Sequence, residues 1–194
     1  MTGKATLGSV AALLSGHLGP WTVDDVLALP EAPSRIELVG GALLLSPNPD
    51  VPRQRARSAL AARLAQAAEA GAAPLEVLPA VPVLVPDGLL IPDLVVVDAA
   101  AAAEATSALD AGAVVVAIEI TTPSTRMTDT VLKPALYATA SIPHYWRLEL
   151  EPTPRLHLGH LERGTYTDRL VQASETTALT DPFPLDLDPA ALRR

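Results

Sequence analysis

The most constraining stretch of the sequence is an apolar run from Ala113 to Ile120 that contains a single acidic residue, Glu119. A short run of this kind, rich in valine, is typical of a strand that is buried on both faces of a sheet. A buried carboxylate costs several kcal/mol unless it meets a cation, a metal ion or a proton. Glu119 therefore requires a partner, and the sequence offers candidates on both sides of it.

Two other charged residues are the natural candidates. Asp93 stands directly before a second apolar run, Leu94 to Val97, and Lys133 lies downstream in a segment with helical spacing. The chain has twelve arginines but only two lysines, Lys4 and Lys133. A compact ammonium group that can lose its proton is not interchangeable with a guanidinium group. Two acids at strand ends with a lysine fit a metal-dependent phosphodiesterase site, and they equally fit a buried ion pair.

Composition narrows the class of protein. The chain has 194 residues, which predicts one domain over residues 21–194 after a lead-in over residues 1–20. The net charge of −8 disfavours indiscriminate binding to DNA or anionic membranes. Without cysteine there are no disulfides or thiolate metal sites. The short apolar patch from Val10 to Leu14 suits neither a signal peptide nor a membrane span, so we expect a cytoplasmic protein.

Local patterns predict the first elements. Thr22, with Asp25 three residues later, marks the start of a helix. The residues from Arg35 to Val39 alternate in polarity, Gly40-Gly41 tolerates positive φ, and an apolar run returns over Ala42 to Leu45. These features predict a β-hairpin.

The rest of the chain alternates strands and helices. Three prolines between residues 46 and 52 argue against regular structure there, and helical spacing follows from about Arg53 to Ala70. We expect one bent strand from Leu75 to Val85, and a strand from Leu89 to Asp98 that pairs only after Asp93 because of Pro92. Residues 99–112 fit either a crossover helix or a loose connection. The remaining expected elements are a strand over Ala113–Glu119, a helix over Asp129–Ala140, a strand over His144–Leu150 and a hairpin over Leu156–Leu161 and Tyr166–Val171.

This order predicts an α/β domain with a mixed central sheet, flanked by helices, with a hairpin near each end. Ligands collect where the strands of such sheets end, and Asp93 and Glu119 both lie there. Their carboxylates, with the carbonyl of Ile120 or Thr121, can hold Mg²⁺ or Mn²⁺. Lys133 can orient an attacking water or balance charge on the phosphate, and Glu37 can hold a metal-bound water from the other side.

Arginines and histidines supply weaker candidates. Arg53, Arg55 and Arg57 open the expected helix and, with Arg126, can contact phosphates; a solvated helix end is the alternative for the helix arginines. His157 and His160 look like a metal pair. A spacing of three residues places them on opposite faces of a strand, so we expect surface histidines.

The sequence from Glu119 onward resembles the Uma2 family, also called DUF820, of restriction-type endonucleases. The family pattern is an acid, a Ser/Thr-Pro-Ser-Thr turn, Asp, Lys, Tyr and Tyr-Trp. The matching residues are Glu119, Thr122-Pro123-Ser124-Thr125, Asp129, Lys133, Tyr137 and Tyr145-Trp146. The resemblance extends to Arg35–Val39, Ser46-Pro47, Pro92-Asp93 and Pro182-Phe183-Pro184, and so covers nearly the whole chain from Trp21.

This resemblance implies the PD-(D/E)XK restriction-endonuclease-like fold, with Asp93 and Glu119 as metal ligands. The superfamily usually keeps its lysine two residues after the acid, where this chain has Thr121; the family supplies it from the helix, as Lys133. The leading hypothesis is a Mg²⁺-dependent endodeoxyribonuclease that cleaves DNA by metal-activated water. The alternative is a catalytically silent nucleic-acid- or protein-binding module that retains the fold.

Assembly is the last expectation. Cleavage of both strands of a duplex suits a C₂ homodimer, whose symmetry matches that of DNA. The segment from Val10 to Val26 has more apolar surface than a free tail needs, which favours a partner surface. The competing expectation is a monomer in which this segment folds back on its own sheet.

Overall fold

The computed structural model describes residues 14–30, 34–173 and 175–193. Its helices are α2 (Val23–Leu27), α3 (Val51–Ala70), α4 (Ala99–Glu104) and α5 (Lys133–Thr139), with a π-helical turn η2 (Thr128–Leu132) and 3-10 turns η1 (Ala111–Ala113) and η3 (Pro189–Leu192). A five-stranded sheet has the order β2 (Ala42–Pro47), β1 (Ser34–Val39), β5 (Gly88–Leu90), β4 (Val83–Val85), β7 (Leu109–Asp110). A six-stranded sheet has the order β11 (Thr165–Gln172), β10 (Arg155–Glu162), β9 (His144–Glu149), β8 (Val114–Thr121), β6 (Leu94–Asp98), β3 (Leu75–Pro79). The strands β12 (Thr177–Leu179) and β13 (Leu185–Leu187) form a small third sheet.

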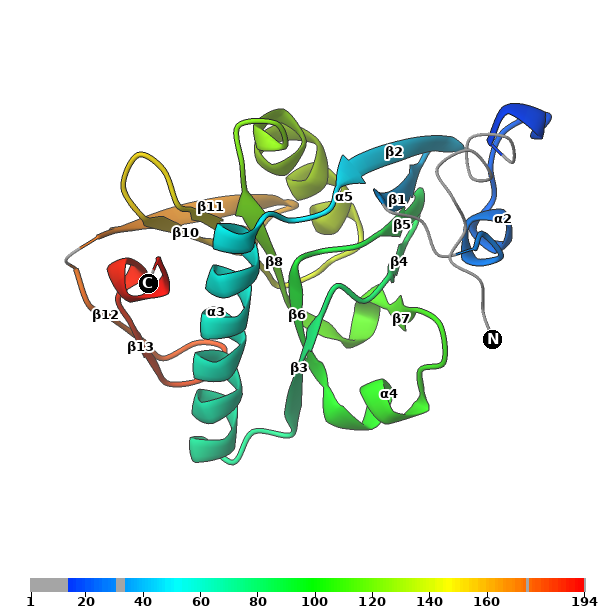
Figure 1. The fold of residues 1–194 in the computed structure, drawn as a ribbon. Helices are drawn as coiled ribbons and strands as arrows, with labels where there is room; N and C mark the ends of the chain where they lie inside the picture. Colours follow the sequence, from blue (N-terminus) through cyan, green and yellow to red (C-terminus); the bar gives the residue numbers. More distant parts are fainter. Residues whose placement is uncertain (1–13, 31–33, 174, 194) are drawn as a thin grey trace, which may run out of the picture.

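The six-stranded sheet is covered on both faces. Helix α3 runs along one face, and β12, β13 and the C-terminal turn lie beside it (Figure 1). The core on this side contains Leu60, Leu64, Val116, Ile118, Ile120, Trp146, Phe183 and Leu187. The opposite face packs against α5 and the five-stranded sheet, with Val83, Val95, Ala117, Tyr137, Ile142 and Tyr145 in its core. The expected mixed sheet flanked by helices is therefore present.

The centre of the sheet explains why β8 is so apolar. This strand pairs antiparallel with β6 and parallel with β9, so it has neighbours on both edges as well as on both faces. Every residue of β8 except Val115 is buried. In a strand, alternate side chains point to opposite faces. Ile118 and Ile120 therefore face α3, and Glu119 faces the side of α5.

The N-terminal expectations are confirmed in detail. Thr22 caps α2, and its side chain and that of Asp25 bond reciprocally to each other's backbone amides. The hairpin of β1 and β2 turns at Gly40 and Gly41, whose φ angles are +57° and +80°. Glycine adopts these left-handed angles without a steric penalty. The C-terminal hairpin of β10 and β11 is also present and turns at Gly164, with φ of +83°.

The proline-rich segment is more regular than the sequence predicts. Strand β2 continues through Ser46 to Pro47, and α3 begins at Val51, so the expectation of no regular structure between residues 46 and 52 is wrong in part. Pro52 lies in the first turn of α3, where its missing N–H would have no partner within the helix. Asp50 caps this helix by accepting a hydrogen bond from the amide of Arg53.

The single bent strand expected over Leu75–Val85 is also wrong. Strand β3 pairs with β6 in the six-stranded sheet, whereas β4 pairs with β5 in the other sheet. The chain changes sheets around Ala80, where φ is +52°. The expected strand from Leu89 to Asp98 is split between the two sheets in the same way, into β5 and β6. Pairing on β6 begins at Leu94, as Pro92 predicts.

The structure also shows the form of residues 99–112 and of the helix expected over Asp129–Ala140. Residues 99–112 contain the short helix α4, the two-residue strand β7 and part of a 3-10 turn. The helix expected from Asp129 is divided into η2 and α5, so that Pro134 falls in the first turn of α5. Within the described residues, no helix has the length and hydrophobicity needed to cross a membrane.

The N-terminal lead-in is described only in part, because Val10 to Leu13 lie outside the described residues. Leu14 and Trp21 pack against the small core that α2 forms with β1 and β5. Leu18, in contrast, is 93% exposed. The described half of the segment thus folds back in part on its own sheet.

Candidate active site

Glu119 meets the partner that its burial requires. Its side chain is completely buried on β8, and its Oε1 lies 2.7 Å from Nζ of Lys133. The hydroxyl of Tyr137 donates to the same oxygen at 3.2 Å. Lys133 and Tyr137 are four residues apart on α5, so both side chains reach the same spot from one face of the helix.

Lys133 has a second carboxylate partner from the other sheet. Its Nζ lies 2.8 Å from Oε1 of Glu37, a buried residue of β1. The same oxygen accepts a hydrogen bond of 2.7 Å from the amide of Ile91. One ammonium group therefore joins the N-terminal hairpin, the central strand and α5.

Asp93 lies directly before β6 and is held by arginines. Its Oδ1 accepts from Nη2 of Arg35 at 2.8 Å. Its Oδ2 accepts from Arg53, at 2.6 Å from Nη2 and 3.2 Å from Nε. The amide of Ile120 adds a hydrogen bond of 2.7 Å to Oδ2. Both oxygens of Asp93 are therefore engaged by groups of the protein.

Arg35 brings the two acids together. Its Nη1 lies 3.8 Å from Oε2 of Glu119, while its Nη2 bonds to Asp93. Nη1 also donates to the carbonyl of Ile91 at 2.8 Å. Asp93 and Glu119 thus face one guanidinium group, and Lys133 approaches Glu119 from the other side. The cluster is closed to solvent, since Glu37, Asp93 and Glu119 are all 0% exposed.

Burial and the neighbouring charges together shift the pKa values of Glu119 and Asp93 in opposite directions. Burial raises the pKa of Glu119 to about 8; Lys133 opposes this shift, and the neighbouring carboxylates of Asp129, Asp93 and Glu37 add to it. Burial acts in the same sense on Asp93, but Arg35 and Arg53 outweigh it and hold the pKa of Asp93 below its usual value. The carboxylates around Lys133 outweigh its burial and raise its pKa.

Asp129 is a further buried acid at this site. Its Oδ2 accepts a hydrogen bond of 2.6 Å from the hydroxyl of Thr125, and its backbone carbonyl accepts one of 2.7 Å from Tyr145. Burial raises the pKa of Asp129. The described cluster therefore contains four carboxylates, from Glu37, Asp93, Glu119 and Asp129, against three cations, from Arg35, Arg53 and Lys133.

The donor set fits a hard divalent cation. Oε2 of Glu37 and Oε2 of Glu119 are buried and accept no hydrogen bond. Buried carboxylate oxygens without a partner are costly, and oxygen atoms of this kind are the ligands that Mg²⁺ and Mn²⁺ prefer. With its pKa raised to about 8, Glu119 holds a proton for much of the time near neutral pH, and a cation bound at this carboxylate would take the place of that proton. The amide of Ile120 places that residue at the site, and a ligand role for its carbonyl stays a prediction.

The arginines expected at phosphates have different positions. Arg55 and Arg126 are exposed and Arg57 is half-buried, but Arg53 is only 4% exposed and bonds to Asp93. The expectation that Arg53 forms a solvated helix end is therefore wrong, because a carboxylate forty residues away lies beneath the first turn of α3. Arg53 and Arg126 line a surface pocket of ≈ 300 Å³, together with Thr121, Thr122, Pro123, Leu150, Glu151 and Arg193.

Sequence reasoning missed Arg35 and Tyr137 as members of the site. The alternation along β1 already contains the signal for Arg35, since Arg35 and Glu37 are two residues apart and face the same side. Helical spacing contains the signal for Tyr137, which stands one turn after Lys133.

The two histidines of β10 lie on opposite faces, as expected. His157 is near Glu149 and Asp168, at 3.7 Å and 3.8 Å. His160 lies instead beside His144, and only His160 is exposed. The expectation of a surface position is therefore wrong for His157, which is half-buried between β9 and β11.

Comparisons with known proteins agree with this arrangement. A model of the Uma2 family, described as "Putative restriction endonuclease", matches residues 23–192. Among the matching solved structures is one described as "a putative nuclease belonging to DUF820 from Anabaena variabilis". It is 14% identical, the match covers 90% of this chain and 100% of that one, and the TM-score is 0.72. At this identity the likeness shows the fold, which is the expected restriction-endonuclease-like one. No curated protein matched the chain.

Proposed function

Because the chain belongs to the Uma2 family of restriction-type nucleases, we propose that it is a Mg²⁺-dependent endodeoxyribonuclease that hydrolyses phosphodiester bonds, with Mn²⁺ as an alternative ion. The observation that supports the proposal is a pair of buried carboxylate oxygens that accept no hydrogen bond, Oε2 of Glu37 and Oε2 of Glu119, the second of which lies 3.8 Å from Nη1 of Arg35. Burying each of these oxygens without a hydrogen bond is costly, and a bound cation would offset that cost.

Asp93 and Glu119 are the residues that would hold the ion. Both face the guanidinium of Arg35, which lies 2.8 Å from one carboxylate and 3.8 Å from the other. We propose that Arg35 neutralises the two acids in the metal-free protein and withdraws when the ion binds. The bound ion would lower the pKa of a water molecule and polarise the phosphate.

Lys133 acts as a fixed cation in this proposal. Its carboxylate neighbours raise its pKa, so it keeps its proton at neutral pH and does not serve as a general base. With Nζ at 2.7 Å from Glu119 and 2.8 Å from Glu37, it orients both carboxylates. Its charge stabilises the phosphorane-like transition state, which carries more negative charge than the substrate.

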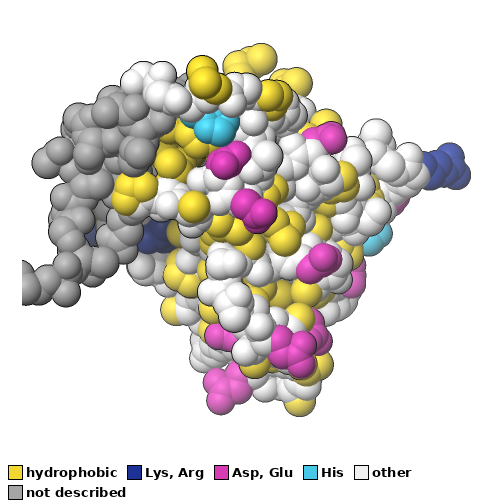
Figure 2. Space-filling view, turned by 90° about the vertical axis from the view of Figure 1, so that its right-hand side faces the viewer, with side chains coloured by type: hydrophobic (Ala, Val, Ile, Leu, Met, Phe, Trp, Pro, Cys, Tyr) yellow, Lys and Arg dark blue, Asp and Glu magenta, His cyan; other side chains and the backbone are white. Residues whose placement is uncertain are grey.

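The DNA backbone would approach through the surface pocket next to Asp93. The polar residues that line this pocket are three arginines, two threonines and two acids, namely Arg53, Arg126, Arg193, Thr121, Thr122, Asp50 and Glu151. Guanidinium groups and hydroxyls are common donors to phosphate oxygens. The side of the molecule that carries α2 and β7 suits DNA poorly, because acidic side chains are scattered over it and few Lys or Arg side chains show there (Figure 2).

A DNA cleavage assay with the purified chain tests the proposal. Supercoiled and linear DNA are incubated with Mg²⁺ or Mn²⁺, and nicked and linear products are quantified. Glu119→Gln and Asp93→Asn should each lower the rate by at least about 100-fold while circular dichroism stays unchanged. Glu76→Gln is the matched control, because Glu76 is exposed on the same sheet. Equal rates in all variants would mean that the cleavage comes from a contaminating enzyme and would refute the proposal.

A second candidate is a nucleic-acid- or protein-binding module without catalytic activity, and the hydrogen bonds of Asp93 favour it. Both oxygens of Asp93 are occupied by arginines and a backbone amide, and the carboxylates are closed to solvent. If Arg35 and Arg53 keep these positions in solution, no ion enters. The outcome expected for this candidate is DNA binding in a mobility-shift assay that does not depend on divalent ions, with no cleavage of any DNA.

A further inference from the structure

A second group of ligand side chains lies on the opposite face of the six-stranded sheet from Glu119. His144 opens β9 and shares the face of Trp146, which packs toward α3. His160, on the antiparallel strand β10, is its direct cross-strand partner. Residues in this relation have Cβ atoms roughly 5 Å apart, so their side chains stand side by side. The ring centroids of the two histidines are 4.9 Å apart.

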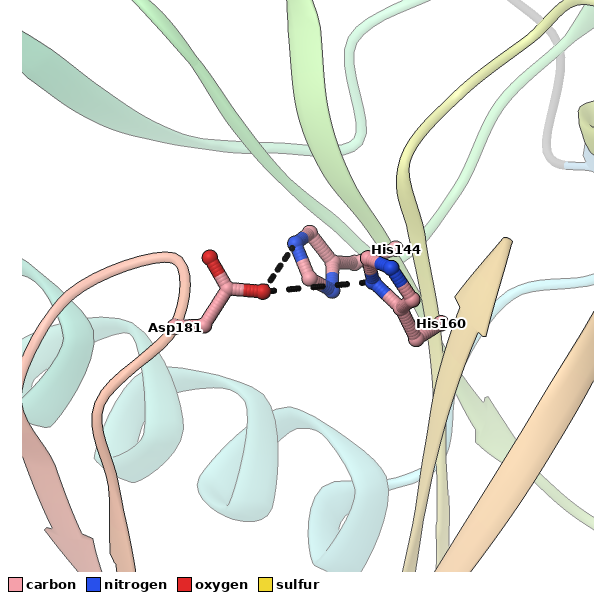
Figure 3. Close-up of side chains that lie close together, drawn as sticks. All are labelled: His144, His160 and Asp181. Atoms are coloured by element: carbon pink, nitrogen blue, oxygen red, sulfur yellow. Dashed lines mark ion pairs between the residues drawn. The ribbon is translucent and has the colours of Figure 1, made fainter. Parts of the chain in front are cut away.

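A carboxylate completes the group from a third segment of the chain. Asp181 lies in the loop between β12 and β13, and its Oδ2 faces both imidazoles (Figure 3). This oxygen is 3.2 Å from Nε2 of His144 and 3.9 Å from Nδ1 of His160. The three ligand atoms all lie within 4.8 Å of one another.

We propose that His144, His160 and Asp181 bind one Zn²⁺ ion or a similar late first-row divalent cation. Ligand atoms around a tetrahedral Zn²⁺ at its usual bond lengths are separated by ~3.3 Å. The contact between His144 and Asp181, at 3.2 Å, already has this separation, that between His160 and Asp181 is 3.9 Å, and no two of the three ligand atoms are more than 4.8 Å apart. Two imidazoles with one carboxylate suit Zn²⁺ better than Mg²⁺, which prefers oxygen ligands alone.

Two of the three side chains are exposed, so the ligand atoms can move closer together around an ion. Side chains of His160 and Asp181 are 53% and 68% exposed, so both can adjust without moving the core. His144 is fixed, with 8% of its side chain exposed. An ion pair alone explains the group less well. An ion pair with Asp181 engages the two rings unequally, at 3.2 Å and 3.9 Å, whereas one cation would be bound by all three ligand atoms at once.

The ion would attach the C-terminal part of the chain to the sheet. Phe183 and Leu185, just after Asp181, pack into the core beneath α3. A cation held by Asp181 and two strands would fix the position of this loop, and the exposure of His160 and Asp181 leaves a coordination position for water. The site is structural, and it does not depend on the nuclease proposed above.

The first test detects Zn²⁺ binding from the NMR signals of the histidine ring nitrogens and requires no variant. Zn²⁺ is added to the full chain with ¹⁵N-labelled histidine, and long-range ¹H–¹⁵N spectra report each ring nitrogen. The chain has four histidines, so the spectrum resolves the site. One equivalent of Zn²⁺ should shift the ring nitrogens of His144 and His160 and leave those of His17 and His157 in place. Unshifted His144 and His160 signals, or equal shifts in all four histidines, would overturn the proposal.

The second test measures affinity by isothermal titration calorimetry with Zn²⁺ alone. The variants are His160→Gln and Asp181→Asn, which alter exposed side chains and keep the fold. Each should weaken binding by at least 10-fold and remove the rise in melting temperature that Zn²⁺ produces in the parent chain. His157→Gln is the control, because His157 lies on the same strand outside the group. Affinity that is unchanged in the two variants, or equally weakened in the control, would show that the ion binds elsewhere.

Discussion

Replacement of Lys133 by methionine tests the buried network at its centre. Methionine keeps the apolar stem of the side chain and removes the ammonium group that lies 2.7 Å from Glu119 and 2.8 Å from Glu37. Lys133 is 3% exposed, so water cannot take its place without a rearrangement. The variant therefore leaves two carboxylates facing each other in a closed site.

The loss of unfolding free energy in Lys133→Met depends on how each of the two carboxylates is stabilised without the ammonium group. Removing one partner of a buried ion pair costs about 3–5 kcal/mol. Glu119 adds little to this cost below pH 8, because with a pKa of about 8 it is largely protonated there. Glu37 keeps one hydrogen bond, from the amide of Ile91. We therefore expect the lower end of the range, about 3 kcal/mol, which lowers the melting temperature by roughly 6–12 °C for a domain of this size.

Urea unfolding in EDTA, which removes bound cations, measures this free energy. Arg55→Met is the matched control, since it removes an exposed cation and should change stability by less than about 0.5 kcal/mol. Addition of Glu37→Gln to Lys133→Met should restore at least about 1 kcal/mol, because it removes the stranded charge. A cost for Lys133→Met no larger than that of the control, or no recovery in the double variant, would refute the buried network.

Three further outcomes are expected. Gly88→Ala should lower the free energy of unfolding in urea by more than about 2 kcal/mol, because a Cβ at Gly88 would lie 2.1 Å from the carbonyl oxygen of Leu38. Gly164→Ala should lower it by less, since the space around Gly164 is open, and equal losses would contradict this packing. Burial lowers the pKa of His157 below its ordinary 6.5, so the stability that its neutral ring contributes is present above pH 6.5 and is lost as the pH falls. His157→Gln should therefore reduce the loss of unfolding free energy between about pH 7 and pH 5. An unchanged pH dependence in this variant would contradict the prediction. We also propose a C₂ homodimer, for which light scattering should give a mass of twice 20.2 kDa. Deletion of residues 1–20 should reduce this to the mass of a monomer. A mass of 20.2 kDa for the full chain would refute the dimer.

The parts of the fold that depend on local chemistry were predictable from the sequence. The carboxylate in the apolar run of β8 predicted a buried partner, and Lys133 is that partner. The two glycines after β1 predicted the hairpin, and Pro92 predicted where β6 begins to pair. In each case the residue types alone restrict the backbone or require a charge.

The parts that depend on distant segments were not predictable in the same way. The chain crosses from one sheet to the other between β3 and β4, and nothing near Ala80 shows which strand each will pair with. A phosphate contact and a solvated helix end both place Arg53 at the surface, because its own helix gives no reason for burial; the reason is Asp93, which follows it by forty residues. The spacing of His160 from His157 indicates only that the two lie on opposite faces of a strand, whereas the neighbour of His160 is His144, which lies across the register of β9 and β10.

The most direct measurement is the position of Mn²⁺ in crystals of the full chain, located by anomalous diffraction. We expect a peak between Asp93 and Glu119, about 2.1 Å from an oxygen of each carboxylate, with the guanidinium of Arg35 withdrawn from both. The His144 group serves as an internal reference, since its ligands favour Zn²⁺. A map with no peak at Asp93 and Glu119, and with Arg35 still bridging them in the presence of excess Mn²⁺, would contradict the proposal that these two acids bind the ion.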